Sequence, residues 1–137
     1  MPAVRFDFIK NNEAVAVVND GNGNVAVEEG STFTFDLFVT DATDVAVDLT
    51  GYDARMKIRK HVNDTTVLAS WSVSGGEITL NGTSDPNLSI SVTATATAAL
   101  EWDGSAFYDL EIDDQGGTPV VTRLIEGYIE LSREVTR

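Results

Sequence analysis

Hydrophobic and polar residues alternate over most of this chain, and this period of two restricts its fold more than any other feature. Successive side chains of a β-strand point to opposite faces, so alternation predicts strands with one face on a core. The clearest case is "YDARMKIRK", which sets Tyr52, Ala54, Met56 and Ile58 against Asp53, Arg55, Lys57 and Arg59. Further strands are predicted at residues 3–9, 32–39, 66–73, 77–80, 88–93, 106–113 and 120–132.

In two of these strands the alternation does not fully decide which residues face the core. In residues 32–39 the side chains of Phe33, Phe35 and Leu37 share one face, and we expect the strand to end or bulge at Phe38 and Val39. In residues 66–73 the inward set is either that of Trp71 and its alternate neighbours or the opposite one, and the pattern does not choose between them. The turn-rich stretch at residues 18–31 is interpreted as an exposed hairpin tip.

Turn signals separate the predicted strands at intervals typical of all-β sandwiches and barrels. A chain of 137 residues is long enough for one core. The Thr/Ala-rich residues 93–102 predict a short helical turn near 95–101 that crosses between two sheets. We therefore predict an all-β fold, an antiparallel immunoglobulin-like β-sandwich that forms a single domain over residues 1–137.

One tyrosine supports this fold class. In "LEWDGSAFYDL", a crossover turn precedes a strand in which Tyr108 lies two residues before Leu110. Immunoglobulin-like sandwiches carry a tyrosine at this place, and its hydroxyl bonds back to the upstream backbone. Tyr108 is therefore predicted to form a structural tyrosine corner, with Leu110 in the place of the second core cysteine.

The composition excludes several classes of function. The 22 acidic residues outnumber the 9 basic ones and give a net charge of −13, which disfavours binding to nucleic acid phosphates. The chain has no cysteine, so it has no thiolate nucleophile and no cysteine-ligated metal site. No apolar run reaches the length of about 18 residues that a membrane helix needs, and "MPAVRFDFIKNN" does not resemble a secretory signal.

No set of residues predicts catalysis or a cofactor. His61 is the only histidine, no Gly-x-Ser-x-Gly elbow is present, and a surface role fits a loop histidine better than a base. The carboxylate pairs Glu28/Glu29, Glu101/Asp103 and Asp113/Asp114 are too common in this chain to indicate a glycosidase. The "DGNGN" stretch from Asp20 begins like an EF-hand loop, but Val25 replaces the glycine of the sixth position and Ser31 replaces the glutamate of the twelfth. A turn is therefore the better interpretation.

Four of the nine basic residues, Arg55, Lys57, Arg59 and Lys60, fall within six positions. Alternation places such residues on the solvent side of a strand, where they can pair with acidic residues of a neighbouring strand such as Asp109 and Glu111. The alternative is that the four form an interface for another protein or a second copy. Trp71 and Trp102 are candidates for aromatic contact with a sugar, although large aromatics are more often core residues.

The order of several segments resembles a family of short bacteriophage and prophage virion structural proteins. These segments are "DLTGYDARMKIRKH", "GGEITL", "LSISVTATATAALEWDGSAFYDLEI" and "VTRLIEGYIELSREVTR", and the likeness covers about residues 31–137. Related segments are similar to the N-terminal β-sandwich domains of phage baseplate and tail-fibre proteins. Residues 1–30 match less clearly and are interpreted as a possible N-terminal hairpin or arm.

This resemblance implies a non-enzymatic component of the virion that is assembled in the cytoplasm of a bacterial host. The expected place is the tail, the baseplate or a fibre adaptor, with other virion proteins and copies of this chain as partners. Two alternatives stay open at this point, a capsid decoration protein and a carbohydrate-binding module for host adhesion. Nucleic acid and membranes are not expected partners, and no cofactor is expected.

Overall fold

The computed structural model describes residues 3–10, 13–19, 24–40, 45–84 and 86–133, of which residues 3–19 are described by their backbone alone. Ten strands and one short helix occur in these ranges. In chain order they are β1 (Ala3–Lys10), β2 (Glu13–Asn19), β3 (Val25–Glu28), β4 (Phe33–Thr40), β5 (Asp53–Arg59), β6 (Ala69–Ser72), β7 (Ile78–Leu80), β8 (Leu88–Val92), α1 (Ala94–Ala98), β9 (Gly104–Asp113) and β10 (Val121–Ser132). The prediction of an all-β chain is confirmed.

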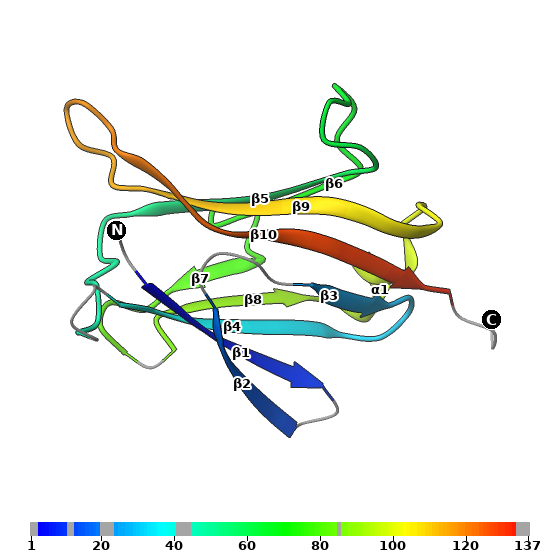
Figure 1. Cartoon of the computed structure of the whole chain (residues 1–137), viewed down its shortest axis with the longest axis horizontal. Coiled ribbons are helices and arrows are strands. Elements are labelled where there is room, and N and C mark those ends of the chain that lie inside the picture. The colour runs from blue at the N-terminus through cyan, green and yellow to red at the C-terminus, as the bar shows by residue number, and fades with distance from the viewer. Residues whose placement is uncertain (1–2, 11–12, 20–23, 41–44, 85, 134–137) are drawn as a thin grey trace.

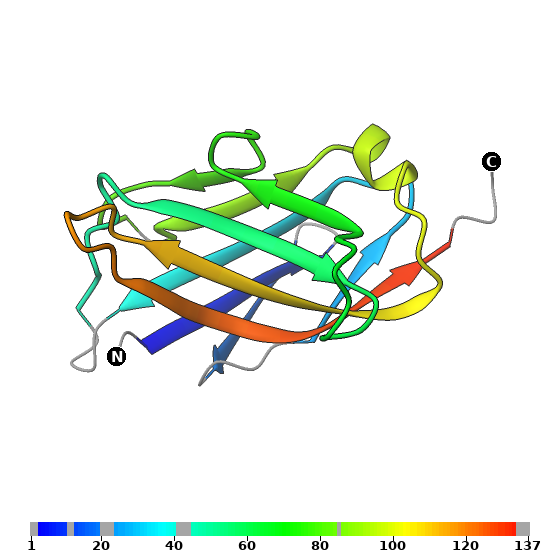
Figure 2. The same ribbon diagram turned by 90° about the horizontal axis from the view of Figure 1, so that it is seen from above.

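The strands form two five-stranded sheets, which Figure 1 shows one above the other. The first sheet has the order β2-β1-β4-β8-β7 and the second has the order β3-β10-β9-β5-β6. All strand pairs are antiparallel except β3 with β10. Figure 2 shows the strands of one sheet lying across those of the other. Both sheets contribute to one hydrophobic core.

The buried positions follow the predicted alternation. Ala54, Met56 and Ile58 of β5 are fully buried, and Ala106, Tyr108, Leu110 and Ile112 of β9 face the same core. Trp71 is the buried residue of β6, so the inward residues of that strand are Trp71 and its alternate neighbours rather than the opposite set. The expected break at Phe38 and Val39 is wrong, because β4 continues to Thr40 and Val39 is a core residue in the regular alternation.

The sequence reasoning missed strand β3. Residues 18–31 were predicted to be an exposed hairpin tip, but Val25–Glu28 pair in parallel with β10, and Val25 and Val27 are buried. Glu29 follows at the end of β3, and its carboxylate lies 3.0 Å from Nε of Arg133. Before β3, β1 pairs with β2 and also with β4. Whether residues 1–30 attach the chain to a neighbour stays a prediction.

Helix α1 carries the chain from β8 in the first sheet to β9 in the second, as predicted for this segment. Thr93 caps the helix, since its hydroxyl oxygen accepts a hydrogen bond from Ala96 N. The buried Thr97 hydroxyl accepts from Gly30 N at 3.1 Å and donates to Ser31 O at 2.8 Å. One side chain of α1 thus holds the turn between β3 and β4.

A buried amide joins the ends of three segments in the first sheet. Asn87, just before β8, accepts a hydrogen bond from Val39 N at 2.8 Å. Its amide nitrogen donates to Val39 O and to Val47 O, both at 3.0 Å. These bonds satisfy backbone groups where β4 ends, and buried backbone groups without a partner are costly.

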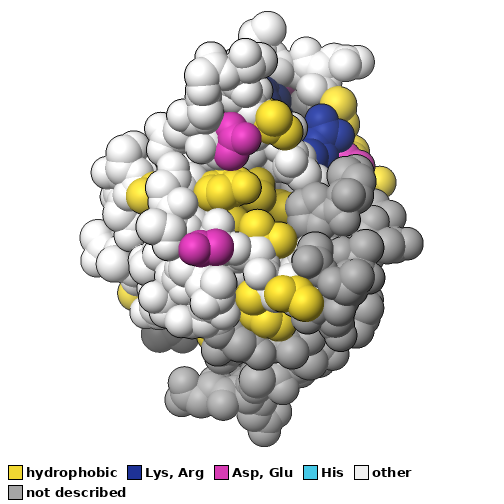
Figure 3. All heavy atoms as spheres, turned by 90° about the vertical axis from the view of Figure 1, so that its left-hand side faces the viewer, with side chains coloured by type: hydrophobic (Ala, Val, Ile, Leu, Met, Phe, Trp, Pro, Cys, Tyr) yellow, Lys and Arg dark blue, Asp and Glu magenta, His cyan; other side chains and the backbone are white. Residues whose placement is uncertain are grey.

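Hydrophobic side chains reach the surface at one end of the molecule. Figure 3 views the end that lies on the left in Figure 1 and shows hydrophobic side chains exposed between polar ones. A wide hollow of about 820 Å³ lies among residues 49–52 and 73–84, and the half-buried Tyr52, Val73 and Leu80 line it. Within the described residues, no helix is long and apolar enough to cross a membrane.

Candidate binding surface on the outer face of strands β5, β9 and β10

Three rows of side chains cross the outer face of strands β5, β9 and β10. In the pairs β5–β9 and β9–β10, each outward residue of β9 lies directly opposite one outward residue of β5 and one of β10. Side chains at such positions are close enough to contact each other. The rows are Arg55–Glu111–Arg123, Lys57–Asp109–Glu126 and Arg59–Phe107–Tyr128. The face is therefore charged in its first two rows and largely aromatic in the third.

A β-bulge in β10 sets the second and third rows. The register shifts between Arg123 and Ile125, so that Leu124 is an extra residue in the strand. Leu124 and Ile125 are both buried, although they are neighbours in the sequence. A shift of one residue exchanges the two faces of a strand, so this bulge lets Arg123 and Tyr128 point outward on the same side.

The first two rows hold ion pairs between strands. Arg55 Nη2 lies 3.3 Å from Glu111 Oε2, so the expectation that the basic strand pairs with an acidic neighbour is confirmed for Arg55. Arg123 Nε lies 3.6 Å from Asp109 Oδ2, and Arg123 Nη1 donates to Glu126 Oε2 at 3.2 Å. All these side chains are partly exposed, so each pair stabilises the fold only slightly.

Two cations of β5, Lys57 and Arg59, have no such partner among the described residues. Lys57 lies opposite Asp109, but it is Arg123 that binds this carboxylate. The side chains of Lys57 and Arg59 have no ion pair or hydrogen bond with any residue in the described ranges. The Nε atom of Arg59 is moreover buried, so water does not solvate it either.

Lys60 behaves differently from the other three basic residues. It directly follows the last residue of β5, and in the alternation of this strand it belongs with the inward residues Ala54, Met56 and Ile58. Its ammonium group donates to Asp103 O at 2.6 Å and to Ser105 O at 2.8 Å. The structure thus places Arg55, Lys57 and Arg59 on one face, as predicted, and uses Lys60 to hold the backbone at the start of β9.

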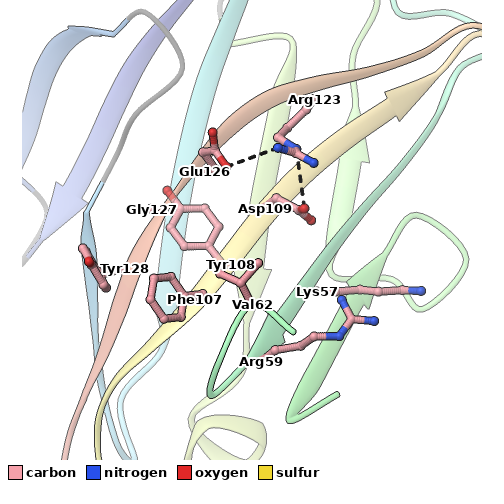
Figure 4. A pocket seen from close by; sticks show the side chains of 10 residues that line it. All are labelled: Lys57, Arg59, Val62, Phe107, Tyr108, Asp109, Arg123, Glu126, Gly127 and Tyr128. Carbon is pink, nitrogen blue, oxygen red and sulfur yellow. Dashed lines mark hydrogen bonds and ion pairs between the residues drawn. The ribbon is translucent and has the colours of Figure 1, made fainter. Parts of the chain in front are cut away.

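A groove of about 300 Å³ lies over the second and third rows. Figure 4 shows Phe107 and Tyr128 on one side of it and Lys57 and Arg59 on the opposite side. Asp109, Arg123 and Glu126 lie along a third side, and Val62 comes from the loop after β5. The rings of Phe107 and Tyr128 are 4.8 Å apart between centroids and tilted by 42°, and Tyr128 is 50% exposed.

The predicted aromatic contacts do not lie on this surface. Trp71 and Trp102 are 5% and 3% exposed and belong to the core, where Trp71 packs against Phe33. In this arrangement neither indole offers a flat face to a sugar. Tyr108 is buried with its ring at a right angle to that of Phe35, and burial raises the pKa of its hydroxyl. Its role as a tyrosine corner stays a prediction.

The remaining candidate residues form turns or fall outside the described ranges. His61 is exposed, and its backbone N–H donates to Asp64 Oδ2 in a turn. Asp114 accepts from the backbone N–H groups of Gly116 and Val120, which shapes the loop between β9 and β10. Asp20–Gly23 of the calcium hypothesis lie outside the described residues, and Asn24 accepts a hydrogen bond from Tyr128 N. No group of metal-ligating side chains occurs among the residues that the structure describes.

The sequence reasoning did not identify Phe107, Arg123 and Tyr128 as members of one surface. Phe107 and Tyr128 belong to predicted strands, and their outward parity in "AFYDLEID" and "EGYIELS" signals exposed aromatics. The two rings are close because β9 pairs with β10 and because of the bulge at Leu124. No local sequence pattern specifies either the pairing or the bulge.

No protein-family model and no curated protein matches this chain. Among solved structures, it is similar to a nucleoside hydrolase-related hypothetical protein from Saccharophagus degradans that is described as associated with carbohydrate metabolism. The two chains are 12% identical with a TM-score of 0.38, and the match covers 97% of this chain and 25% of the other. This chain therefore spans about a quarter of that protein's length. So distant a likeness carries no argument about fold or function.

Proposed function

We propose that this chain is a non-enzymatic structural protein of a bacteriophage virion, placed at the tail or baseplate or as a fibre adaptor. The observation that carries the proposal is the ordered set of segments between residues 31 and 137 that resembles phage virion proteins. The proposed partners are other virion proteins and copies of this chain, met during assembly in the host cytoplasm. Nucleic acid and membrane are not among them.

We also propose that the two sheets form an immunoglobulin-like sandwich. The order β4-β8-β7 corresponds to strands B, E and D of that fold, and β6-β5-β9-β10 corresponds to C′, C, F and G. The crossing of α1 from β8 to β9 corresponds to the connection between E and F, where the tyrosine corner is found. Such sandwiches suit assembly, because their sheet faces and edges offer surfaces for docking.

The outer face of β5, β9 and β10 is the proposed contact surface within the particle. It combines exposed Tyr128 and Val62 with Lys57 and Arg59, two cations that no described residue pairs, in a protein of net charge −13. Aromatic and arginine side chains dominate the energy of many protein interfaces. Charge complementarity then sets the orientation of the partner.

The test is the location of this chain in purified particles of the phage that encodes it. We expect mass spectrometry to find the chain in virions and a reconstruction of the intact particle to show it at the tail. The charge reversals Lys57→Glu and Arg59→Glu should leave the isolated fold intact and remove the chain from particles. The matched control Thr95→Glu, an exposed change on α1, should be incorporated normally. Absence of the wild-type chain from purified virions would overturn the proposal.

A further inference from the structure

The groove over the second and third rows holds two cations, Lys57 and Arg59, that have no counter-ion among the residues that the structure describes. Lys57 and Arg59 are two residues apart on the same face of β5, so their charges repel each other. The chain has 22 carboxylates, yet none in the described ranges pairs with either cation. An anion between the two side chains would relieve the repulsion.

Arg59 adds a second argument, which concerns the exposed end of its guanidinium group. Its Nε atom is buried without a hydrogen-bond partner in the described part of the chain, so a ligand can reach this atom no more than water can. The two Nη atoms are not buried in this way, and they have no partner within the described ranges. Two such donors on one edge of a planar group match the two oxygens of a carboxylate. Arg59 can therefore receive a carboxylate from outside the chain through its Nη atoms.

The other sides of the groove restrict what carries this carboxylate. Phe107 and Tyr128 give an aromatic wall with an exposed phenol ring, which suits the apolar C–H face of a sugar ring. Asp109 and Glu126 are held by Arg123 and keep acceptor sites for hydroxyl groups. A simple acidic side chain of a peptide would bring a carboxylate but no hydroxyl donors for these two acceptors.

We propose that this groove binds an acidic sugar, a single pyranose ring that carries a carboxylate. The carboxylate lies between Lys57 and Arg59, the ring packs on Tyr128 and Phe107, and ring hydroxyls donate to Asp109 and Glu126. The volume of about 300 Å³ is at the small end of ligand pockets and suits one ring rather than a long chain. The inference rests on the groove alone. It gives Lys57 and Arg59 a sugar in place of the protein partner proposed above for the same face, and the proposed place of the chain in a virion does not depend on which of the two occupies the groove.

The test is titration of the full chain with methyl glucuronide and with methyl glucoside, followed by the amide NMR signals of β5, β9 and β10. The two sugars differ only in the carboxylate. We expect the glucuronide to shift signals around Phe107 and Tyr128 and to bind at least about tenfold more tightly than the glucoside, since a charged hydrogen bond is lost in the latter. No binding of the glucuronide, or equal binding of both sugars, would overturn the proposal.

Single substitutions test whether the groove residues bind the glucuronide and whether a basic residue outside the groove does not. Arg59→Gln and Tyr128→Ala should each weaken glucuronide binding at least about tenfold. Arg55→Gln is the matched control, because Arg55 lies on the same face of β5 but outside the groove, and it should bind as the wild type does. If Arg59→Gln does not fold, Arg59→Lys keeps the charge but loses the fork, and it should also bind more weakly. Unchanged binding by a folded Arg59 variant would contradict the site.

One further ligand distinguishes a sugar from an acidic peptide. The α-amide of N-acetylglutamate carries a carboxylate but has no ring and no hydroxyl groups. We expect it to bind at least about tenfold more weakly than the glucuronide, because it lacks the contacts with Tyr128 and Glu126. Binding as tight as that of the glucuronide would assign the groove to an acidic protein segment and would overturn the sugar proposal.

Discussion

Arg55 on β5 lies directly opposite Glu111 on β9, and its guanidinium group bridges two carboxylates of that strand. Nη2 lies 3.3 Å from Glu111 Oε2, and Nη1 lies 3.8 Å from Asp113 Oδ2. The side chains of Arg55 and Glu111 are 33% and 27% exposed, so water screens their attraction. Arg55 thus forms ion pairs within the sheet, whereas Lys57 and Arg59 on the same strand form none with a described residue.

A double-mutant cycle with Arg55→Gln and Glu111→Gln should measure how much the ion pair between these residues stabilises the fold. We expect a coupling free energy of about 0.2–1 kcal/mol in the free energy of unfolding, as for other cross-strand and exposed ion pairs. The coupling should shrink at high salt, because mobile ions screen partly exposed charges. Urea unfolding at low and high salt gives both values. A coupling of zero at low salt would show that the pair does not hold β5 to β9.

Asn87 should be far more important for stability than its single side chain suggests. Asn87→Leu removes the oxygen that accepts a hydrogen bond from Val39 N. It also removes the amide nitrogen that donates to Val39 O and Val47 O, so three backbone groups lose their partner. Each buried polar group left unpaired costs about 1–3 kcal/mol, so we expect a loss of at least about 2 kcal/mol in urea unfolding. Asn63→Leu, at an exposed position, is the control and should change stability little. Equal effects of the two changes would contradict this reading of Asn87.

Thr97 and Thr95 offer a matched pair on helix α1. Thr97→Val keeps the shape of the side chain but removes the hydroxyl that bonds Gly30 N and Ser31 O. We expect this buried change to cost about 1–3 kcal/mol and to speed hydrogen exchange in the turn between β3 and β4. Thr95→Val changes the same residue type at an exposed position and should be nearly neutral. A neutral Thr97→Val would show that the hydroxyl is not needed there.

Two surface aspartates should make stability depend on pH in acid. Hydrogen bonds from Val120 N and Gly116 N lower the pKa of Asp114, and bonds from the Thr50 hydroxyl and backbone lower the pKa of Asp48. A carboxylate whose pKa is lowered by folding stabilises the fold above its unfolded pKa. That stability is lost as the pH falls through the folded value.

We therefore expect the urea midpoint of the wild type to fall as the pH drops below about 4, near the unfolded pKa of aspartate. The double variant Asp48→Asn and Asp114→Asn should be less stable at neutral pH and should lose less on acidification. The measurement is the urea midpoint at a series of pH values from neutral to strongly acidic. Parallel curves for the two proteins would rule out these carboxylates as a source of the pH dependence.

The alternation of residue types was enough to identify most of the strands and most of their faces, although not β3. Alternation in residues 52–59 and 106–113 correctly assigned Met56 and Leu110 to the core and Arg55 and Glu111 to the surface. It could do so because the direction of a side chain in a strand depends only on its place in the chain. The helical turn at α1 was also readable, since its Thr/Ala run and its position between two strands are local features.

Which strands are neighbours depends on how the whole chain packs. Strand β3 lies in a stretch of turn residues, and its parallel pairing with β10 joins segments that are about a hundred positions apart. The bulge at Leu124 then sets which residues of β10 face outward beside β9. These pairings bring Arg123 to Asp109 and place Tyr128 beside Phe107. They also leave Lys57 and Arg59 without a carboxylate partner in the described part of the chain. The register between distant strands depends on the packing of the whole core, so local patterns predicted the faces but not the groove that forms on them.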